Sequence, residues 1–249
     1  MRDDKLYIIN LYQKVKALGF VRSNRSHNTG IGKTFEDYMG VVENNLNAPD
    51  LAGFEIKSHR EESSSYTTLF TKAPDFPPSA NALLNERFGT PYEEGASLKK
   101  LHTSIFATSY NSYMSTYSFR LINDRQSKQI RIGVYEFGTY KLLDHSTGYS
   151  YSTIDRILSR KLKKMFYVSA ERKFEQGEEL FFFNHADIYL QPSLSKFLEL
   201  LDAGLIMYDI RMGCYQSGRK YGLPHDHGSC FRMLEQNIHL LYEVHETID

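Results

Sequence analysis

Apolar residues recur at helical spacing near the start of the chain. Leu6, Ile9 and Val15 fall on one face of a helix, and Gly19 is typical of a helix end. The pattern predicts an amphipathic helix over residues 4–18, with one face packed on a core and the other in solvent.

Farther along, helical spacing alternates with the two-residue period of strands. Helices are expected at residues 34–44 with Thr34 as N-cap, 80–88, 152–165 capped by Ser152 or Thr153, 191–204, and from Ser229 onward. Strands are expected at residues 53–58, 65–72, 103–109, 165–174, 179–190 and 205–215, with a hairpin over 116–137. The first two strands are expected to pair with each other. This mixture predicts an α+β fold with a mixed, largely antiparallel sheet flanked by helices.

The length of 249 residues suits one large domain with a substantial core. No shift in composition marks a linker, and the chain contains no internal repeat or low-complexity tract. We therefore expect a single domain over residues 1–249.

Composition narrows the functional classes only in part. The formal net charge is zero, so overall charge predicts no nucleic-acid partner. Cys214 and Cys230 are the only cysteines, which favours a reducing compartment such as the prokaryotic cytoplasm over a disulfide framework. The first twenty residues lack a long apolar run, so neither a signal peptide nor a membrane span is expected.

Basic residues are nevertheless concentrated in three places. Residues 1–33 carry seven Lys or Arg against two Asp, and residues 156–164 carry five basic residues and no acidic one. Residues 211–232 hold four basic residues against one Asp. Such runs are typical of solvated faces, but they can also bind phosphate.

The strongest chemical signal lies in "NAPDLAGFEIKSHR", residues 47–60. Alternation in an extended chain places Glu55 and Lys57 on one face and their apolar neighbours on the other. The preceding segment contains Pro and Gly, which are typical of a turn, and this turn can fold Asp50 back beside Glu55. The sequence therefore brings two carboxylates and one ammonium to one place.

Adjacent carboxylates repel each other and are difficult to ionise without a cation nearby. A hard divalent ion that prefers oxygen ligands, such as Mg²⁺, relieves this repulsion. Lys57 is then placed to polarise a water or to hold a charged substrate oxygen. A solvated edge strand can also read E-x-K, so the fuller pattern P-D-x4-E-x-K carries the inference.

Residues 30–57 together resemble the PD-(D/E)xK nucleases. More narrowly they resemble the MvaI/BcnI family of type II restriction endonucleases, relatives of the mismatch-repair nickase MutH. In that family a glycine loop leads into a helix with a Glu, followed by a Pro-Asp turn and E-x-K. The resemblance is continuous over about thirty residues, and beyond them it rests on length and on a basic, His-containing loop near the C-terminus.

The resemblance implies a PD-(D/E)xK nuclease core and Mg²⁺-dependent hydrolysis of double-stranded DNA. It implies a CC-N-GG type of target such as CCWGG, and a monomer that cuts one strand at a time. We expect two lobes around a DNA-binding cleft, a catalytic one at about residues 1–150 and recognition elements at about 151–249.

The resemblance also assigns roles to individual residues. Asp50, Glu55 and the carbonyl of Ile56 would bind Mg²⁺, and Lys57 would orient or activate the attacking water. Glu36 would be an outer or second-site carboxylate, although an early helical Glu also stabilises the helix dipole without any metal. The glycines of the loop, Gly30 and Gly32, could cradle a phosphate through their amides, which is a weak signal alone.

Sequence reading requires side chains that reach base edges. Asp209 and Arg211 share one strand face, and together they could read a C·G pair, since Arg reaches guanine O6 and N7 while a carboxylate accepts from cytosine N4. A structural ion pair on the strand is an equally good interpretation. Further DNA contacts are expected from Arg219, Lys220, His225, His227, Arg232, Lys33, His59 and Arg60, and phosphate contacts from Lys161, Lys163 and Lys164.

Other interpretations stay open at this point. Cys214, His225, His227 and Cys230 could in principle form a zinc site, although their spacing is not that of a zinc finger. The alternative functions are a MutH-like nickase, a non-catalytic sequence-specific DNA-binding protein, or a hydrolase of small phosphate esters. The acidic pair with its lysine argues against a protein that only binds.

Overall fold

The computed structural model describes residues 4–25, 30–41, 49–61, 65–93 and 97–248. They form two compact units, each assembled from separate stretches of the chain. Unit 1 comprises Met1–Ser64, Ile157–Ser193 and His239–Asp249, and unit 2 comprises Ser65–Arg156 and Leu194–Ile238. A single division near residue 150 does not follow these units, because strands from the middle and end of the chain join the N-terminal segment in one sheet.

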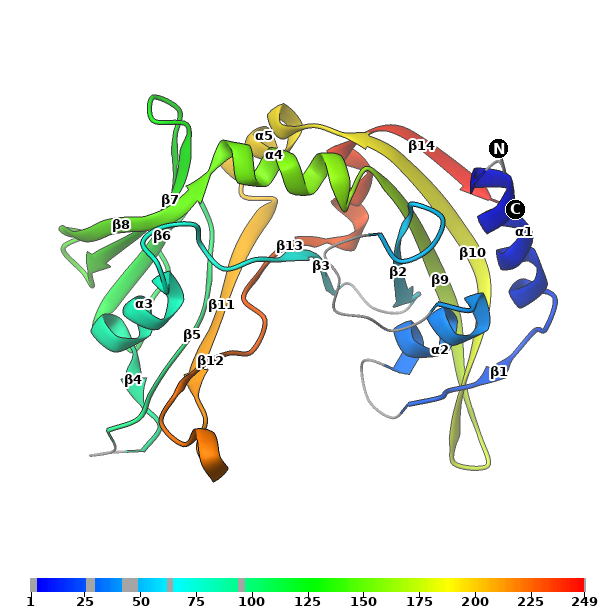
Figure 1. The fold of residues 1–249 in the computed structure, drawn as a ribbon, viewed down its shortest axis with the longest axis horizontal. Helices are drawn as coiled ribbons and strands as arrows, with labels where there is room; N and C mark the ends of the chain where they lie inside the picture. The colour runs from blue at the N-terminus through cyan, green and yellow to red at the C-terminus, as the bar shows by residue number, and fades with distance from the viewer. Residues whose placement is uncertain (1–3, 26–29, 42–48, 62–64, 94–96, 249) are drawn as a thin grey trace. The chain divides into compact units, whose positions relative to one another are not determined.

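Unit 1 is built on a five-stranded sheet of order β1-β10-β9-β2, with β14 also paired to β10. Its strands are β1 Val21–Arg22, β2 Glu55–Arg60, β9 Lys164–Glu175, β10 Glu178–Pro192 and β14 Tyr242–Ile248. Strand β2 runs parallel to β9, and the other pairs are antiparallel. Figure 1 shows the long β9–β10 hairpin that forms the centre of this sheet.

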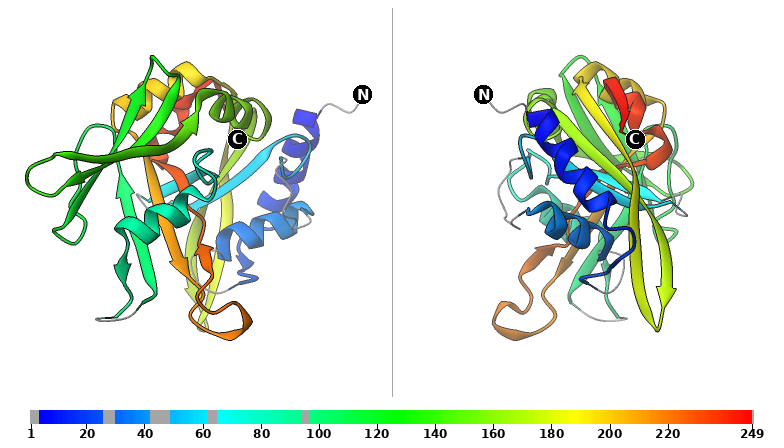
Figure 2. Two further views of the ribbon diagram at one scale, coloured as in Figure 1. Left: turned by 60° about the vertical axis from the view of Figure 1, so that its left-hand side comes forward. Right: turned by 90° about the vertical axis from the view of Figure 1, so that its right-hand side faces the viewer.

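Helices α1, Asp4–Lys16, and α2, Gly30–Met39, pack side by side on one face of this sheet (Figure 2). The core between them contains Phe54 and Ile56, which flank Glu55 in sequence. Because side chains alternate along a strand, burial of these two residues turns Glu55 and Lys57 to the opposite face.

Unit 2 contains a six-stranded sheet of order β3-β13-β11-β5-β4, with β12 paired to β11, and a three-stranded sheet of order β6-β7-β8. The strands of the larger sheet are β3 Tyr66–Thr71, β4 Thr90–Pro91, β5 Lys99–Ile105, β11 Ile206–Cys214, β12 Pro224–Asp226 and β13 Cys230–Leu234. The smaller sheet contains β6 Tyr117–Asp124, β7 Gln129–Glu136 and β8 Leu142–Ser150. The unit also includes helices α3 Ala80–Phe88 and α5 Leu194–Asp202 and the 3₁₀ turn η1 Gly218–Lys220.

Helix α4, Tyr151–Arg160, carries the chain from unit 2 into unit 1. Its N-cap is Ser150, whose Oγ accepts a hydrogen bond from the backbone N–H of Thr153 at 3.3 Å. The backbone N–H and the hydroxyl of Ser150 in turn donate to Asp75 Oδ2 at 3.0 and 2.9 Å. The caps expected at Ser152 or Thr153 are therefore wrong, since both residues lie inside the first turn.

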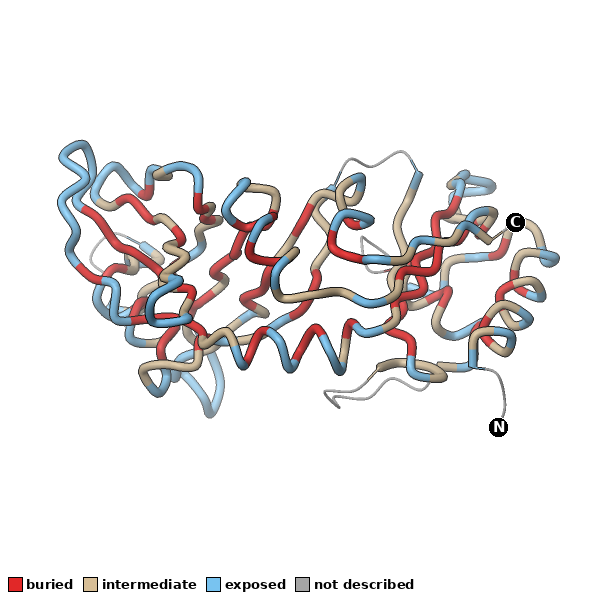
Figure 3. Tube along the Cα trace, turned by 90° about the horizontal axis from the view of Figure 1, so that it is seen from above, coloured by how far each residue is buried: buried red, intermediate tan, exposed pale blue. Residues whose placement is uncertain are grey.

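Most elements expected from periodicity are present. They are α1, β2, β3, α3, the β6–β7 hairpin, α4, β9, β10, α5 and β11. Buried residues follow the strands, whereas exposed residues gather at turns and outer helix faces (Figure 3). No helix in the described part of the chain is long and apolar enough to span a membrane.

Several expectations fail where long-range pairing decides the structure. Strand β3 pairs with β13 and not with β2, which pairs with β9. The helix expected from Ser229 is instead strand β13, followed by the 3₁₀ segment η2, Glu235–Leu241, and by β14. Strand β13 lies between β3 and β11, and its strand conformation depends on pairing with these two partners rather than on a local pattern.

Smaller differences concern element boundaries. Helix α2 begins at Gly30 rather than Thr34, strand β5 lies ahead of the expected residues 103–109, and β8 was not expected. The Thr34 hydroxyl accepts a hydrogen bond from the backbone N–H of Asn24 at 2.8 Å, so it ties the preceding segment to the helix and does not cap it.

Candidate active site

A tight turn places Asp50 at the start of β2. Ala52 and Gly53 have φ angles of 49° and 77°, and Leu51 and Phe54 exchange backbone hydrogen bonds of 3.1 and 2.8 Å across them. Two successive left-handed residues form the tight turn that suits hairpins, and glycine adopts this conformation without strain. The reversed chain lets Asp50 Oδ2 accept a hydrogen bond from the backbone N–H of Ile56 at 2.8 Å.

Glu55 lies beside Asp50 in an almost fully buried position, with 2% of its surface exposed. The Lys57 ammonium donates to Glu55 Oε1 at 2.6 Å. Burial raises the pKa of the Glu55 carboxyl, Lys57 opposes this shift, and the negative charge of Asp50 adds to it. The structure therefore brings together the two carboxylates and the lysine that the sequence predicted.

The second oxygen of Glu55 is the most informative atom of the site. Oε2 is buried and has no hydrogen-bond partner, although a buried polar atom without a partner costs about 1–3 kcal/mol. Asp50, Glu55 and the Ile56 carbonyl offer the hard oxygen ligands that Mg²⁺ prefers, and a bound cation would satisfy Oε2. These residues fit a divalent ion. Within the described residues no three His, Cys, Asp or Glu side chains form a metal cluster.

A further lysine reaches this carboxylate from a distant part of the chain. Lys161 follows α4, and its ammonium lies 3.6 Å from Glu55 Oε1. The sequence predicts for Lys161 only a contact with DNA phosphates, because no local spacing links this residue to Glu55. The parallel pairing in which Glu55 opposes Met165 of β9 brings the two together.

The helix α2 residues are less clearly part of the site. Glu36 is half-buried on α2, which packs against β2, and its catalytic role stays a prediction. The Lys33 ammonium pairs with Asp37 at 2.7 Å, one helical turn away. A side chain at Gly30 would collide with the Arg25 carbonyl, with its Cβ at 2.2 Å, so close packing explains this glycine without a phosphate.

The other two candidates on β2 make contacts inside unit 1. The His59 ring stacks on Tyr167 with a centroid distance of 4.8 Å. The Arg60 guanidinium pairs with Glu179 at 3.0 Å and lies over the Phe181 ring at 5.3 Å. A structural role accounts for both side chains, and their contact with DNA stays a prediction.

In unit 2 the expected pair of Asp209 and Arg211 is joined by Arg232. Asp209 is 1% exposed; its Oδ1 accepts from the Ser104 hydroxyl at 2.8 Å. Its Oδ2 accepts from Arg211 Nε at 2.9 Å and from Arg232 Nη1 at 3.2 Å. This arrangement favours an orienting role for Asp209, which holds two partly exposed arginines, over direct contact of its carboxylate with a base.

Histidines lie next to these arginines. His225 and His227 have ring centroids 4.2 Å apart, and His225 also stacks on Tyr215 at 4.3 Å. His102, opposite Arg211 on β5, lies 6.0 Å from His227, and burial, with Arg211 and His227, lowers its pKa. His102 was missed because only the pairing of β5 with β11 places it there.

The remaining candidates of this loop are exposed. Arg219 and Lys220 lie in η1, with the Lys220 ammonium over the Tyr215 ring at 5.2 Å. The zinc interpretation is not supported, since Cys214 Sγ lies 3.6 Å from the Lys99 carbonyl and Cys230 Sγ lies 3.8 Å from the Thr68 hydroxyl.

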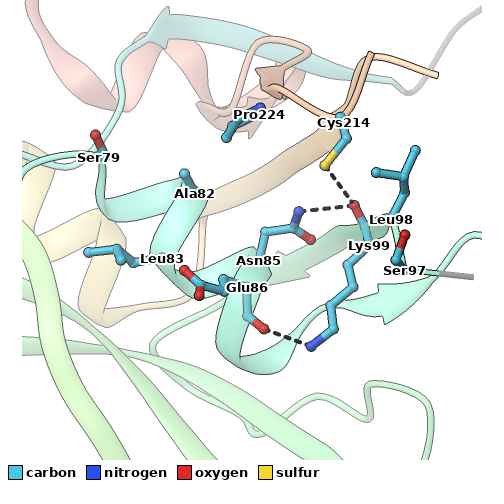
Figure 4. Close-up of a pocket in the computed structure, with 11 residues that line it drawn as sticks. Ser79, Ala82, Leu83, Asn85, Glu86, Ser97, Leu98, Lys99, Cys214 and Pro224 are labelled. Atoms are coloured by element: carbon cyan, nitrogen blue, oxygen red, sulfur yellow. Dashed lines mark hydrogen bonds between the residues drawn. The ribbon is translucent and has the colours of Figure 1, made fainter. Parts of the chain in front are cut away.

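Unit 2 also contains an open cavity of about 320 Å³ between α3, β5 and the segment after β11. Figure 4 shows Asn85 and Cys214 directed to the Lys99 carbonyl at its wall. Among its described lining residues Glu86 is the single carboxylate, and none of them is Asp50, Glu55 or Lys57.

The turn at Asp50 and strand β2 thus carry residues that fit a divalent ion, and comparison with known proteins identifies the family of the chain. The sequence model described as the MvaI/BcnI restriction endonuclease family matches residues 9–242. The chain belongs to this family, and is thus a type II restriction endonuclease, a site-specific deoxyribonuclease.

Two solved structures show the same fold. One is the complex of restriction endonuclease MvaI with its cognate DNA substrate, with a TM-score of 0.89, 33% identity and 100% coverage of both chains. The other is MvaI in the absence of DNA, with a TM-score of 0.67, 33% identity and coverage of 100% and 99%. At this identity the chain is a homologue of MvaI and not MvaI itself. The comparison with curated proteins finds no match.

Proposed function

We propose that this protein cleaves double-stranded DNA in a Mg²⁺-dependent reaction at a CC-N-GG type of site such as CCWGG. The single observation that carries the proposal is the buried, unpartnered Oε2 of Glu55 beside Asp50 and Lys57. Restriction endonucleases generally use divalent metal ions, and the similarity to MvaI in complex with cognate DNA supports DNA as the substrate.

In this proposal the residues of β2 and of the turn before it have different roles. Asp50, Glu55 and the Ile56 carbonyl hold the ion, which supplies water activation and neutralises charge at the phosphate. Lys57, whose side chain is directed at Glu55, would orient the attacking water and donate to a phosphate oxygen. Glu36, on α2, would act as an outer or second-site carboxylate.

We assign recognition of the DNA sequence to unit 2. Asp209 holds the Arg211 guanidinium through Nε, which suits a bidentate contact of its two terminal nitrogens with guanine. Arg232 donates to Asp209 through Nη1 and to the Tyr66 carbonyl through Nη2, and would contact the DNA beside Arg211. The exposed Arg219, Lys220 and His227 and the half-buried His225 would add contacts from the neighbouring loop. We propose that the protein acts as a monomer that cuts one strand at a time.

Plasmid cleavage tests this proposal directly. Three plasmids carrying one CCWGG site, one CCSGG site or no such site are incubated with Mg²⁺, with Ca²⁺, or with EDTA. We expect discrete linear DNA with Mg²⁺ from plasmids with a target site, through a nicked intermediate. Shifted but intact DNA in every condition would support a protein that only binds, and a persistent nick would support a nickase.

The matched control is Glu55→Gln, which keeps the shape of the side chain and removes its charge. Cleavage by this variant at the wild-type rate would contradict the assignment of the β2 site. Cleavage of all plasmids alike would contradict the proposed target.

A further inference from the structure

Two ammonium groups converge on one oxygen of Glu55. Lys57 Nζ lies 2.6 Å from Oε1 and Lys161 Nζ lies 3.6 Å from the same atom. The other oxygen, Oε2, has no partner. The carboxylate is therefore asymmetric, with both cations on one side and an unoccupied lone-pair direction on the other.

The contact of Lys161 differs from an ordinary surface ion pair. Exposed pairs contribute little because water screens both charges, but Glu55 is 2% exposed and the Lys161 side chain is 26% exposed. The backbone around Lys161 is also fixed. Its N–H and that of the fully buried Leu162 both donate to the Ile157 carbonyl, at 2.9 and 3.2 Å. The end of α4 thus sets where this ammonium can reach.

We propose that Lys161 is a positioning residue of the catalytic centre. Together with Lys57 it holds Oε1 of Glu55, so that Oε2 stays directed to the site of the divalent ion. The inference rests on the proposed metal-dependent cleavage. It gives Lys161 a task different from the general phosphate contact expected from its sequence.

The charges around Glu55 determine what loss of Lys161 does. Asp50 and Lys57 face this carboxylate from the turn and from β2, and the buried Tyr242 faces it from β14. Lys161 adds one positive charge that repels a cation at Oε2. Its removal is expected to tighten metal binding and, because Glu55 is held less well, to slow the reaction.

The experiment uses Lys161→Met in the full chain, with Lys141→Met as the matched control. Lys141 is exposed and belongs to none of the expected sites. Ca²⁺ binding to the complex with cognate duplex is measured by isothermal titration calorimetry, and single-turnover cleavage is measured with Mg²⁺. For Lys161→Met we expect Ca²⁺ binding on the order of tenfold tighter and cleavage roughly 10- to 100-fold slower. Lys141→Met is expected to match wild type, and Lys161→Arg to recover part of the rate.

The opposite results overturn the proposal. Unchanged Ca²⁺ affinity and rate would leave Lys161 as an ion-pair partner only. Weaker Ca²⁺ binding together with a lower melting temperature would show a purely structural role. Weaker binding to cognate and scrambled duplexes alike, with a reduced salt slope, would return Lys161 to the phosphate contacts. A wild-type protein that does not cleave with Mg²⁺ would contradict the proposed function, while the Ca²⁺ titration would still decide the role of Lys161.

Discussion

Two carboxylates of this protein are buried to almost the same degree and are used in different ways. Glu55 of unit 1 is 2% exposed and Asp209 of unit 2 is 1% exposed. Both oxygens of Asp209 accept hydrogen bonds, from Ser104 and from two arginines, whereas Oε2 of Glu55 accepts none. Burial alone therefore does not distinguish a ligand site from an orienting group; the state of each oxygen does.

The same difference separates what each unit contributes. Around Asp209 the hydrogen bonds are complete within the protein, so the carboxylate fixes the arginines before any DNA arrives. At Glu55, by contrast, Oε2 has no hydrogen-bond partner within the protein and is left to bind the divalent ion that we propose. The raised pKa of Glu55 shows that its burial is not fully compensated by the lysines.

The largest expected effect concerns Glu55→Gln. Loss of the charge at the metal site should lower the single-turnover cleavage rate by at least about 10³-fold. Binding of cognate duplex in Ca²⁺-free buffer should be unchanged or tighter, because a negative charge facing a phosphate is removed. Fluorescence anisotropy and gel-based cleavage measure the two quantities. A wild-type cleavage rate would show that Glu55, like Asp209, has a structural role.

The next effect is expected for Asp209→Asn. The amide is neutral and keeps only one of the two acceptor oxygens, so the charge-assisted hydrogen bonds to the arginines are weakened and the free energy of unfolding should fall by about 1–3 kcal/mol. Urea denaturation of this variant beside Glu55→Gln measures the contrast. Equal stability of Asp209→Asn and wild type would show that the Asp209 hydrogen bonds contribute little.

Arg211→Ala sharpens the recognition side of the comparison. Loss of a bidentate contact with guanine should cost about 1–3 kcal/mol of discrimination against the wrong base. Competition between cognate and scrambled duplexes at several salt concentrations gives the ratio of affinities. If this ratio is unchanged, Arg211 is only an ion-pair partner of Asp209. The loop with Arg219 and His225 is then the leading candidate for recognition of the DNA sequence.

The smallest effect is a pH dependence of stability in EDTA. The folded protein holds the Glu55 proton more tightly than the unfolded chain, so ionisation costs stability as the pH rises above the ordinary value of 4.5. Glu55→Gln does not pay this cost. Its melting temperature should exceed that of wild type at pH 8, and the difference should narrow as the pH falls toward 4.5. A difference that does not vary with pH would show that Glu55 ionises normally.

The part of the site that is local in sequence could be predicted from sequence. Alternation along β2 fixes the common face of Glu55 and Lys57, and a two-residue turn is enough to return Asp50 to them. The same holds for helices with clear apolar faces, such as α1 and α5. In these cases neighbours within a few residues determine the outcome.

The rest depends on contacts between distant residues. Lys161 reaches Glu55 only because β2 pairs with β9, and His102 reaches Arg211 only because β5 pairs with β11. Likewise, the expected helix from Ser229 is strand β13, because pairing with β3 and β11 determines its conformation. No spacing within one segment encodes such pairings.

The arrangement of unit 1 has a consequence for synthesis of the protein. The strand that carries Glu55 is made early, but its partner β9 follows more than a hundred residues later, and β14 belongs to the last segment of the chain. Tyr242, which is buried next to Glu55, also arrives with that segment. Strand pairing over such separations is slow and cannot begin until both strands have left the ribosome. A chain whose synthesis has not yet reached β9 therefore lacks the central strands of the sheet to which β2 pairs.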